Sequence, residues 1–204
     1  MRRLLTLAFA ISTCLSVQAL SIESPTEVSK ALALAADLGP NARTNYSTSD
    51  SNEFVLGVVL TEESGKLLVL QRQSTGGYRL VAASSAFESS FGPRYYIEIV
   101  QSSGERRFAI QVNSHSACGI QVEIYRLANT NGIWRVTGYD KSEPDSATCD
   151  VNLRSREYSA NLLTHKVSVV EYRNGKVVKR KSRITKSAAP ELKAFSFSMF
   201  QDEP

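Results

Sequence analysis

The sequence is poor in the residues that metal sites and nucleophilic catalysis most often use. Its 204 residues include only two histidines and three cysteines, which leaves few candidates for a catalytic triad or a zinc site. Cysteine is also too scarce for a disulfide-built mini-protein, and a chain of this length can fold around one core without metal. The sequence has no Gly-x-Ser-x-Gly elbow, Ser-x-x-Lys motif, phosphate loop or dinucleotide fingerprint. We therefore expect no enzyme and no cofactor, with a hidden hydrolase as the alternative.

Long apolar runs are absent except at the start of the chain. Residues 1–19 combine two arginines with an apolar stretch over 4–17 and small residues up to Ala19. This pattern predicts a Sec-type signal peptide cleaved after Ala19, because the apolar stretch is too short to span a membrane. Lipidation at Cys14 is the alternative. We expect a periplasmic or secreted protein without a transmembrane span.

Export determines how the other two cysteines are interpreted. In an oxidising compartment Cys118 and Cys149 are expected to form a disulfide, which would stabilise the fold by about 3–4 kcal/mol. Two alternatives use the neighbouring His115: a Cys118 nucleophile, or part of a zinc site.

The remaining sequence predicts a mainly β protein with one helix. Ser24, Pro25, Gly39 and Pro40 mark the ends of a helix over about 25–38, and the polar stretch Asn41–Asn52 indicates a linker that completes an N-terminal segment, 20–52. A β domain over 53–204 follows, built as an antiparallel meander, a sandwich or partial propeller-like sheets. Its expected strands are 54–60, 66–73, 78–83, 95–100, 108–112, 120–127, 133–137, 151–158, 166–172, 176–184 and 195–200.

Two local patterns refine this prediction. Asn174-Gly175 indicates a tight hairpin, because both residues tolerate positive φ angles. A weak repeat relates 54–83 to 108–138, since Phe54, Gly65 and Arg72 recur as Phe108, Gly119 and Arg126. Each copy would form a three-stranded unit that stacks on the other.

The run Gly132-Ile-Trp-Arg-Val-Thr-Gly-Tyr-Asp140, followed by Ser159-Ala-Asn-Leu-Leu-Thr-His-Lys166, resembles a pattern in exported bacterial proteins of unknown function. His165 stands where that pattern has glycine. Residues 54–83 are more loosely similar to FG-GAP β-propeller repeats, without their aspartate-rich calcium loop. Neither resemblance implies an activity.

The longest loops predict a contact surface for a protein partner. Loop 84–94 offers residue types that are common at interface hot spots, and loop 138–150 offers carboxylates for a polar rim. A calcium site in the second loop, which also contains Asp150, is the alternative. The candidate contact residues are Phe87, Phe91, Arg94, Asp140, Glu143 and Asp145.

Positive charge gathers near the C-terminus. The chain carries a formal net charge of +4, and residues 166–193 hold nine basic and two acidic side chains. These cations either protect a sheet edge from association or form an anion-binding face. The candidates for that face are Lys176, Lys179, Lys181 and Arg183.

These features lead to one functional hypothesis and one alternative. The first is an exported, non-catalytic protein-binding, inhibitor or immunity-type protein of the bacterial envelope. The alternative is a module that binds an anionic envelope polymer or lipid surface through the basic hairpin. Nucleic acid is not expected as a partner, because an exported chain seldom meets it.

Overall fold

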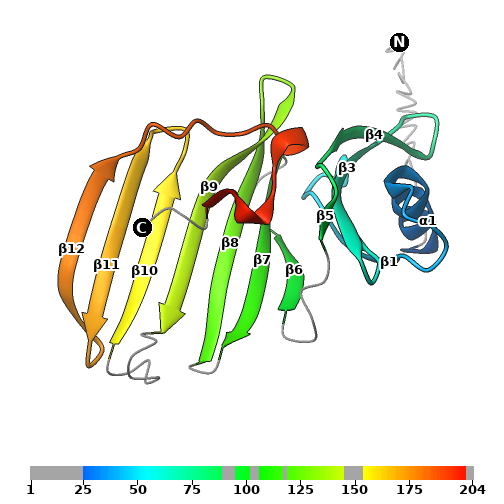
Figure 1. Cartoon of the computed structure of the whole chain (residues 1–204). Helices are drawn as coiled ribbons and strands as arrows, with labels where there is room; N and C mark the ends of the chain where they lie inside the picture. Colours follow the sequence, from blue (N-terminus) through cyan, green and yellow to red (C-terminus); the bar gives the residue numbers. More distant parts are fainter. Residues whose placement is uncertain (1–24, 89–94, 102–105, 117–118, 145–153, 201–204) are drawn as a thin grey trace, which may run out of the picture.

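The computed structural model describes residues 25–88, 95–101, 106–116, 119–144 and 154–200 (Figure 1). The described part is mainly β, with antiparallel sheets that do not close into a barrel, which confirms the predicted fold class. The elements are α1 (Pro25–Ala36), β1 (Arg43–Thr48), β2 (Phe54–Leu60), β3 (Ser64–Arg72), β4 (Tyr78–Ala83), β5 (Phe87–Glu88), β6 (Tyr95–Gln101), β7 (Arg107–Ser116), β8 (Gly119–Thr130), β9 (Ile133–Pro144), β10 (Arg154–Asn161), β11 (Lys166–Arg173), β12 (Lys176–Ile184) and the 3-10 helices η1 (Leu192–Ala194) and η2 (Phe197–Phe200).

The strands form two antiparallel sheets. Sheet A has the order β1-β2-β3-β4, with β5 paired to β3, and sheet B is a seven-stranded meander in which β6 to β12 follow in chain order. Figure 1 shows helix α1 on the side of sheet A that faces away from sheet B. Within the described ranges, no helix has the length and apolar character that crossing a bilayer requires.

Helix α1 covers the face of sheet A that is turned away from sheet B (Figure 1). Its apolar residues pack closely there because one residue of β2 is glycine. Val28, Leu32 and Ala36 are buried against apolar side chains of β2 and β3. Leu32 is fully buried, and a Cβ atom added at Gly57 would lie 2.3 Å from its Cδ2 atom. The absence of a side chain at Gly57 therefore lets the helix lie close to the strand.

The main core lies between the two sheets and centres on the only tryptophan of the chain. The Trp134 ring on β9 lies 5.5 Å from the Phe54 ring on β2 and 5.7 Å from the Phe108 ring on β7, measured between centroids. Phe54 and Phe108 are the matching positions of the predicted repeat, and both segments do form three-stranded meanders, β2-β3-β4 and β7-β8-β9. Trp134 thus joins the two meanders.

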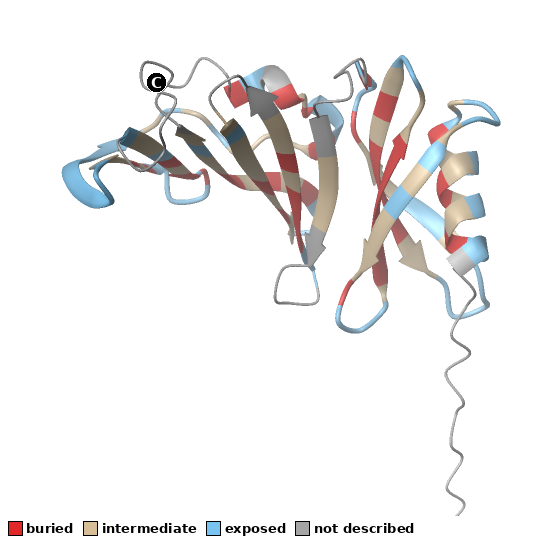
Figure 2. Ribbon diagram, turned by 90° about the horizontal axis from the view of Figure 1, so that it is seen from below, coloured by how far each residue is buried: buried red, intermediate tan, exposed pale blue. Residues whose placement is uncertain are grey.

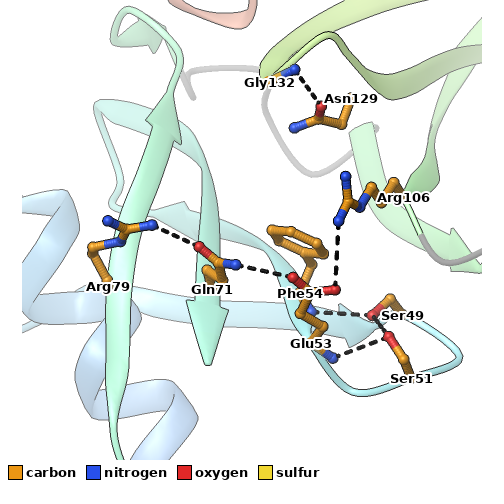
Figure 3. A network of polar contacts seen from close by, with 9 residues as sticks. All are labelled: Ser49, Ser51, Glu53, Phe54, Gln71, Arg79, Arg106, Asn129 and Gly132. Atoms are coloured by element: carbon orange, nitrogen blue, oxygen red, sulfur yellow. Dashed lines mark hydrogen bonds and ion pairs between the residues drawn. The ribbon is translucent and has the colours of Figure 1, made fainter. Parts of the chain in front are cut away.

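A chain of polar contacts runs along the rim of this junction (Figure 3). Arg79 donates to Gln71 at 2.7 Å, Gln71 donates to Glu53 at 2.9 Å, and Glu53 lies 4.0 Å from Arg106, which precedes β7. The Arg106 guanidinium also lies 5.7 Å from the centre of the Phe54 ring. These side chains are partly exposed, so their contacts add little to the free energy of unfolding. Their role is to link the rims of the two sheets.

The C-terminal segment, residues 185–200, covers one face of sheet B, which we call the inner face. Phe195, Phe197 and Phe200 are buried there against Tyr125 and Tyr139. The predicted strand over 195–200 is therefore wrong. Its buried residues are spaced by two and then three positions, which a strand cannot bring to one face, and the backbone turns into 3-10 helices instead.

Two other sequence predictions need correction. The stretch Asn41–Asn52 is not only a linker, because β1 pairs along its length with β2. Polar side chains suit this edge strand, because none of its residues is fully buried. In addition, β9 continues to Pro144 instead of ending at Thr137, so the expected loop 138–150 begins as a strand.

The predicted Asn-Gly hairpin is confirmed. Asn174 and Gly175 have φ angles of 51° and 69°, as the turn between β11 and β12 requires. His165, in the turn between β10 and β11, also has a positive φ of 56°. The turn therefore forms with histidine at a position where glycine would adopt the same backbone conformation without strain.

Candidate functional site

The loop residue Phe87 belongs to the core. It lies on β5, is 7% exposed, and contacts the Phe197 ring at 4.8 Å between centroids. Its ring fills the space beside Gly65, where an added Cβ would approach within 2.4 Å. Phe87 is therefore not available to a partner, because its ring is needed to pack the C-terminal segment against sheet A.

Asp140 and Glu143 lie on β9, and both are already paired. Arg126 on β8 forms an ion pair with Asp140 and donates to the Ala160 carbonyl at 3.0 Å. Ser159 donates to the other Asp140 oxygen at 2.5 Å, while Lys141 pairs with Glu143 at 2.8 Å. Asp140 therefore ties β9 to β8 and β10, whereas Glu143 is paired within β9 itself. Neither carboxylate lines a free loop.

Several predicted residues lie outside the described residues. They are Phe91 and Arg94 of the first loop, Asp145 of the second, and both cysteines of the expected disulfide, Cys118 and Cys149. The disulfide and the remaining loop contacts stay predictions. Among the residues that the structure does describe, no three His, Cys, Asp or Glu side chains are grouped so that they could hold a metal ion.

The inner face contains a polar cluster built around two buried tyrosines. The Tyr125 hydroxyl contacts Glu123 at 2.5 Å and the Phe197 carbonyl at 3.2 Å. Burial, the Glu123 charge and the hydrogen bond to Glu123 together raise the pKa of Tyr125 far above its ordinary value. Burial and the charge of Glu123 likewise raise the pKa of Tyr139. Both phenols are therefore neutral donors and poor candidates for general bases near neutral pH.

Alkaline pH should destabilise the protein through these tyrosines. Above about pH 10 the unfolded chain releases phenolic protons that the folded chain keeps, so stability falls by about 1.4 kcal/mol per pH unit for each such tyrosine. We expect urea unfolding between pH 8 and 11 to show this decline and Tyr125→Phe to show a shallower one. An unchanged slope in the variant would contradict the assignment.

The basic residues gather along the last strand of sheet B, which we call the basic edge (β12, Lys176–Ile184). All nine of its residues are exposed, and five of them are cationic with no acidic residue among them. Figure 2 shows exposed residues concentrated at this end of the sheet, beyond the core. The predicted residues Lys176, Lys179, Lys181 and Arg183 thus share one accessible strand.

The strand register divides these cations between two faces. Lys179, Lys181 and Arg183 pair with Glu171, Val169 and Val167 of β11, whose valines are buried on the inner face. Because directly paired residues share a face, these three cations line the inner face at the border of the sheet. Arg180 pairs with Val170 and lies on the opposite face. Lys179 forms an ion pair with Glu171 at 3.6 Å.

Among the described elements, the basic edge differs from the other sheet borders because it has no substantial neighbour apart from its own partner β11. β1 of sheet A lies beside β6 of sheet B, and β4 packs against η1. Among the described elements, β12 packs substantially on β11 alone. Its outer backbone groups are therefore open. The prediction from sequence named the lysines and arginines of this strand but not its unpaired backbone groups. The signal was present, because the last strand of a meander is always an edge.

Within the described residues, the basic edge combines exposed cations with outward backbone groups of an edge strand. Cations on an exposed strand can hold anionic groups, and an unpaired strand can accept another strand. Comparison of the chain with family models, curated proteins and solved structures gave no match.

Proposed function

We propose that the chain is an exported, non-catalytic binding protein that holds an anionic partner along the basic edge. The observation that carries the proposal is the complete exposure of β12 together with its five cations and lack of acids. Export is supported by the sequence of residues 1–19. Binding without catalysis is supported by the scarcity of histidine and cysteine.

The geometry supports an interaction role over edge protection alone. Lysine is one of several devices that keep sheet edges from pairing, whereas β12 carries five cations distributed over both faces. Like charges at this density repel one another and must be kept apart by the fold. An anionic partner would relieve this repulsion, which favours binding at the edge.

Binding through the basic edge should depend on salt and on three side chains. Polyglutamate is a suitable first probe, measured by isothermal titration calorimetry at several salt concentrations. In the variant Lys179→Gln/Lys181→Gln/Arg183→Gln, we expect affinity to fall at least about tenfold at low salt, with a salt slope smaller by about two to three. Part of the loss comes from Glu171, whose carboxylate loses its Lys179 partner.

The matched control removes the same charge elsewhere. Lys30 on α1, Arg43 on β1 and Arg79 on β4 are exposed and lie on the sheet A side of the molecule. Their triple change to glutamine should leave affinity within about twofold of the parent protein, because screening limits long-range effects. Equal losses in both variants would show that net charge, not the basic edge, controls binding. Absence of any binding at low salt would overturn the proposal.

A further inference from the structure

One hydrogen bond at the end of β12 shows which of its backbone N–H and C=O groups point toward β11 and which point outward. The Thr185 amide donates to the His165 carbonyl at 2.9 Å, and Lys166 pairs with Ile184. In an antiparallel ladder, this contact makes Lys166 and Ile184 a non-hydrogen-bonded pair, and the pairs then alternate along the strands. The backbones of Arg183, Lys181 and Lys179 therefore bond to β11, whereas those of Ser182 and Arg180 point outward.

This alternation fixes how an added strand would meet the cations. Its backbone would bond to the outward groups of Arg180 and Ser182, and its intervening residues would lie opposite Lys179, Lys181 and Arg183 at non-hydrogen-bonded positions. Side chains approach most closely at such positions, where Cα atoms are about 4.5 Å apart. Carboxylates at alternate positions of the added strand would thus face all three cations on the inner face.

We propose that the anionic partner is an extended protein segment that adds to β12 as a further strand and carries acidic residues at alternate positions. This inference rests on the proposed function and specifies its partner. It uses both open features of the basic edge, since the segment would satisfy the outward backbone groups as well as the charges. Such strand addition draws affinity from main-chain hydrogen bonds and specificity from alternate side chains.

Other occupants fit the edge less well. A second copy of the chain would bring two β12 strands together and place five cations against five, which like-charge repulsion opposes. A flat lipid surface would contact only one face of the strand. It could not bind Arg180 and Lys181 together, because they lie on opposite faces. Neither a lipid surface nor a polyphosphate chain can pair with the outward N–H and C=O groups as a peptide backbone does.

The test uses a variant that blocks strand addition without altering charge. The Ser182 N–H points outward, so Ser182→Pro removes a donor that an added strand needs while leaving the bonds to β11 in place. Ser182→Ala is the matched control. The probe is a synthetic peptide in which glutamate alternates with threonine, compared with a peptide of the same composition whose glutamates are consecutive.

We expect the alternating peptide to bind about tenfold more tightly than the consecutive one, and Ser182→Pro to weaken it by a similar factor while Ser182→Ala does not. Hydrogen exchange of the parent protein gives a second measure that does not depend on the folding of the proline variant. On peptide binding, the amides of Arg180 and Ser182 should gain protection, whereas those of Lys181 and Arg183 should already be protected.

The possible failures can be told apart. Equal binding of both peptides, no effect of Ser182→Pro, or no new protection at Arg180 and Ser182 would each overturn strand addition. Phosphatidylglycerol vesicles or polyphosphate that bind as tightly as the alternating peptide would do so as well. If the triple glutamine variant still loses polyglutamate binding in those cases, the proposed function stands and only the strand partner is wrong.

Discussion

Replacing Trp134 with alanine is expected to lower the free energy of unfolding by about 3–5 kcal/mol, the usual range for a large buried aromatic. The residue is 3% exposed and contacts the rings of both Phe54 and Phe108. Its removal would leave a cavity where sheet A meets sheet B, and the rim contacts of Arg106 and Glu53 are too exposed to compensate. Urea unfolding followed by circular dichroism measures the change.

The control is Trp134→Phe, which separates ring packing from the indole nitrogen. The buried Nε1 atom has no hydrogen-bond partner in the described part of the chain, so the indole N–H is desolvated without compensation. Phenylalanine removes this penalty while it fills most of the space, and we expect a loss below about 1.5 kcal/mol. If the loss in Trp134→Ala were also below about 1.5 kcal/mol, Trp134 would not hold the sheets together.

Apolar runs and the turns beside them predicted several strands well, whether a strand is buried on both faces, as β2 is, or only partly buried, as β4 is. The range Phe54–Leu60 and the range Tyr78–Ala83 agree with β2 and β4 at both ends. Prediction failed where tertiary packing determined the local structure. β1 is a strand because β2 offers it a partner, although its own residues are typical of loops. The aromatic residues of 195–200 predicted a strand. They are buried for another reason, because the segment packs over Tyr125.

The candidate site shows the same division between local and tertiary information. The cations of β12 were visible in the sequence, because charge needs no fold to be recognised. Phe87 was misjudged for the opposite reason: its burial depends on Gly65 and Phe197, which are distant in the chain. The pairing of Asp140 with Arg126 and Ser159 likewise requires three strands in register.

The two halves of sheet B differ in how they are held. β7 to β9 are covered on the inner face by the C-terminal segment, whose Pro190 carbonyl accepts a hydrogen bond from the Val136 amide at 2.9 Å. Arg135 adds a contact to the Ala189 carbonyl at 3.1 Å. β12 has no such cover among the described residues. The sheet thus combines a packed half that supplies stability with an exposed border strand.

Phe197→Ala should show how much the packed half depends on the C-terminal segment, with an expected loss of about 3–5 kcal/mol in the free energy of unfolding. The ring is 6% exposed and lies 4.8 Å from Phe87, 5.2 Å from Tyr125 and 5.0 Å from Phe195, measured between centroids. The substitution removes all three ring contacts and leaves a cavity between Phe87, Tyr125 and Phe195.

Met199→Ala is the matched control, because this residue of the same 3-10 helix is 44% exposed and should change stability by less than about 0.5 kcal/mol. Equal losses in the two variants would contradict the role given to Phe197. Under conditions where Phe197→Ala remains folded, its affinity for polyglutamate should equal that of the parent protein, since β12 packs on β11 and not on the C-terminal aromatic residues. A large loss of affinity there would show that the basic edge and the C-terminal segment act as one unit.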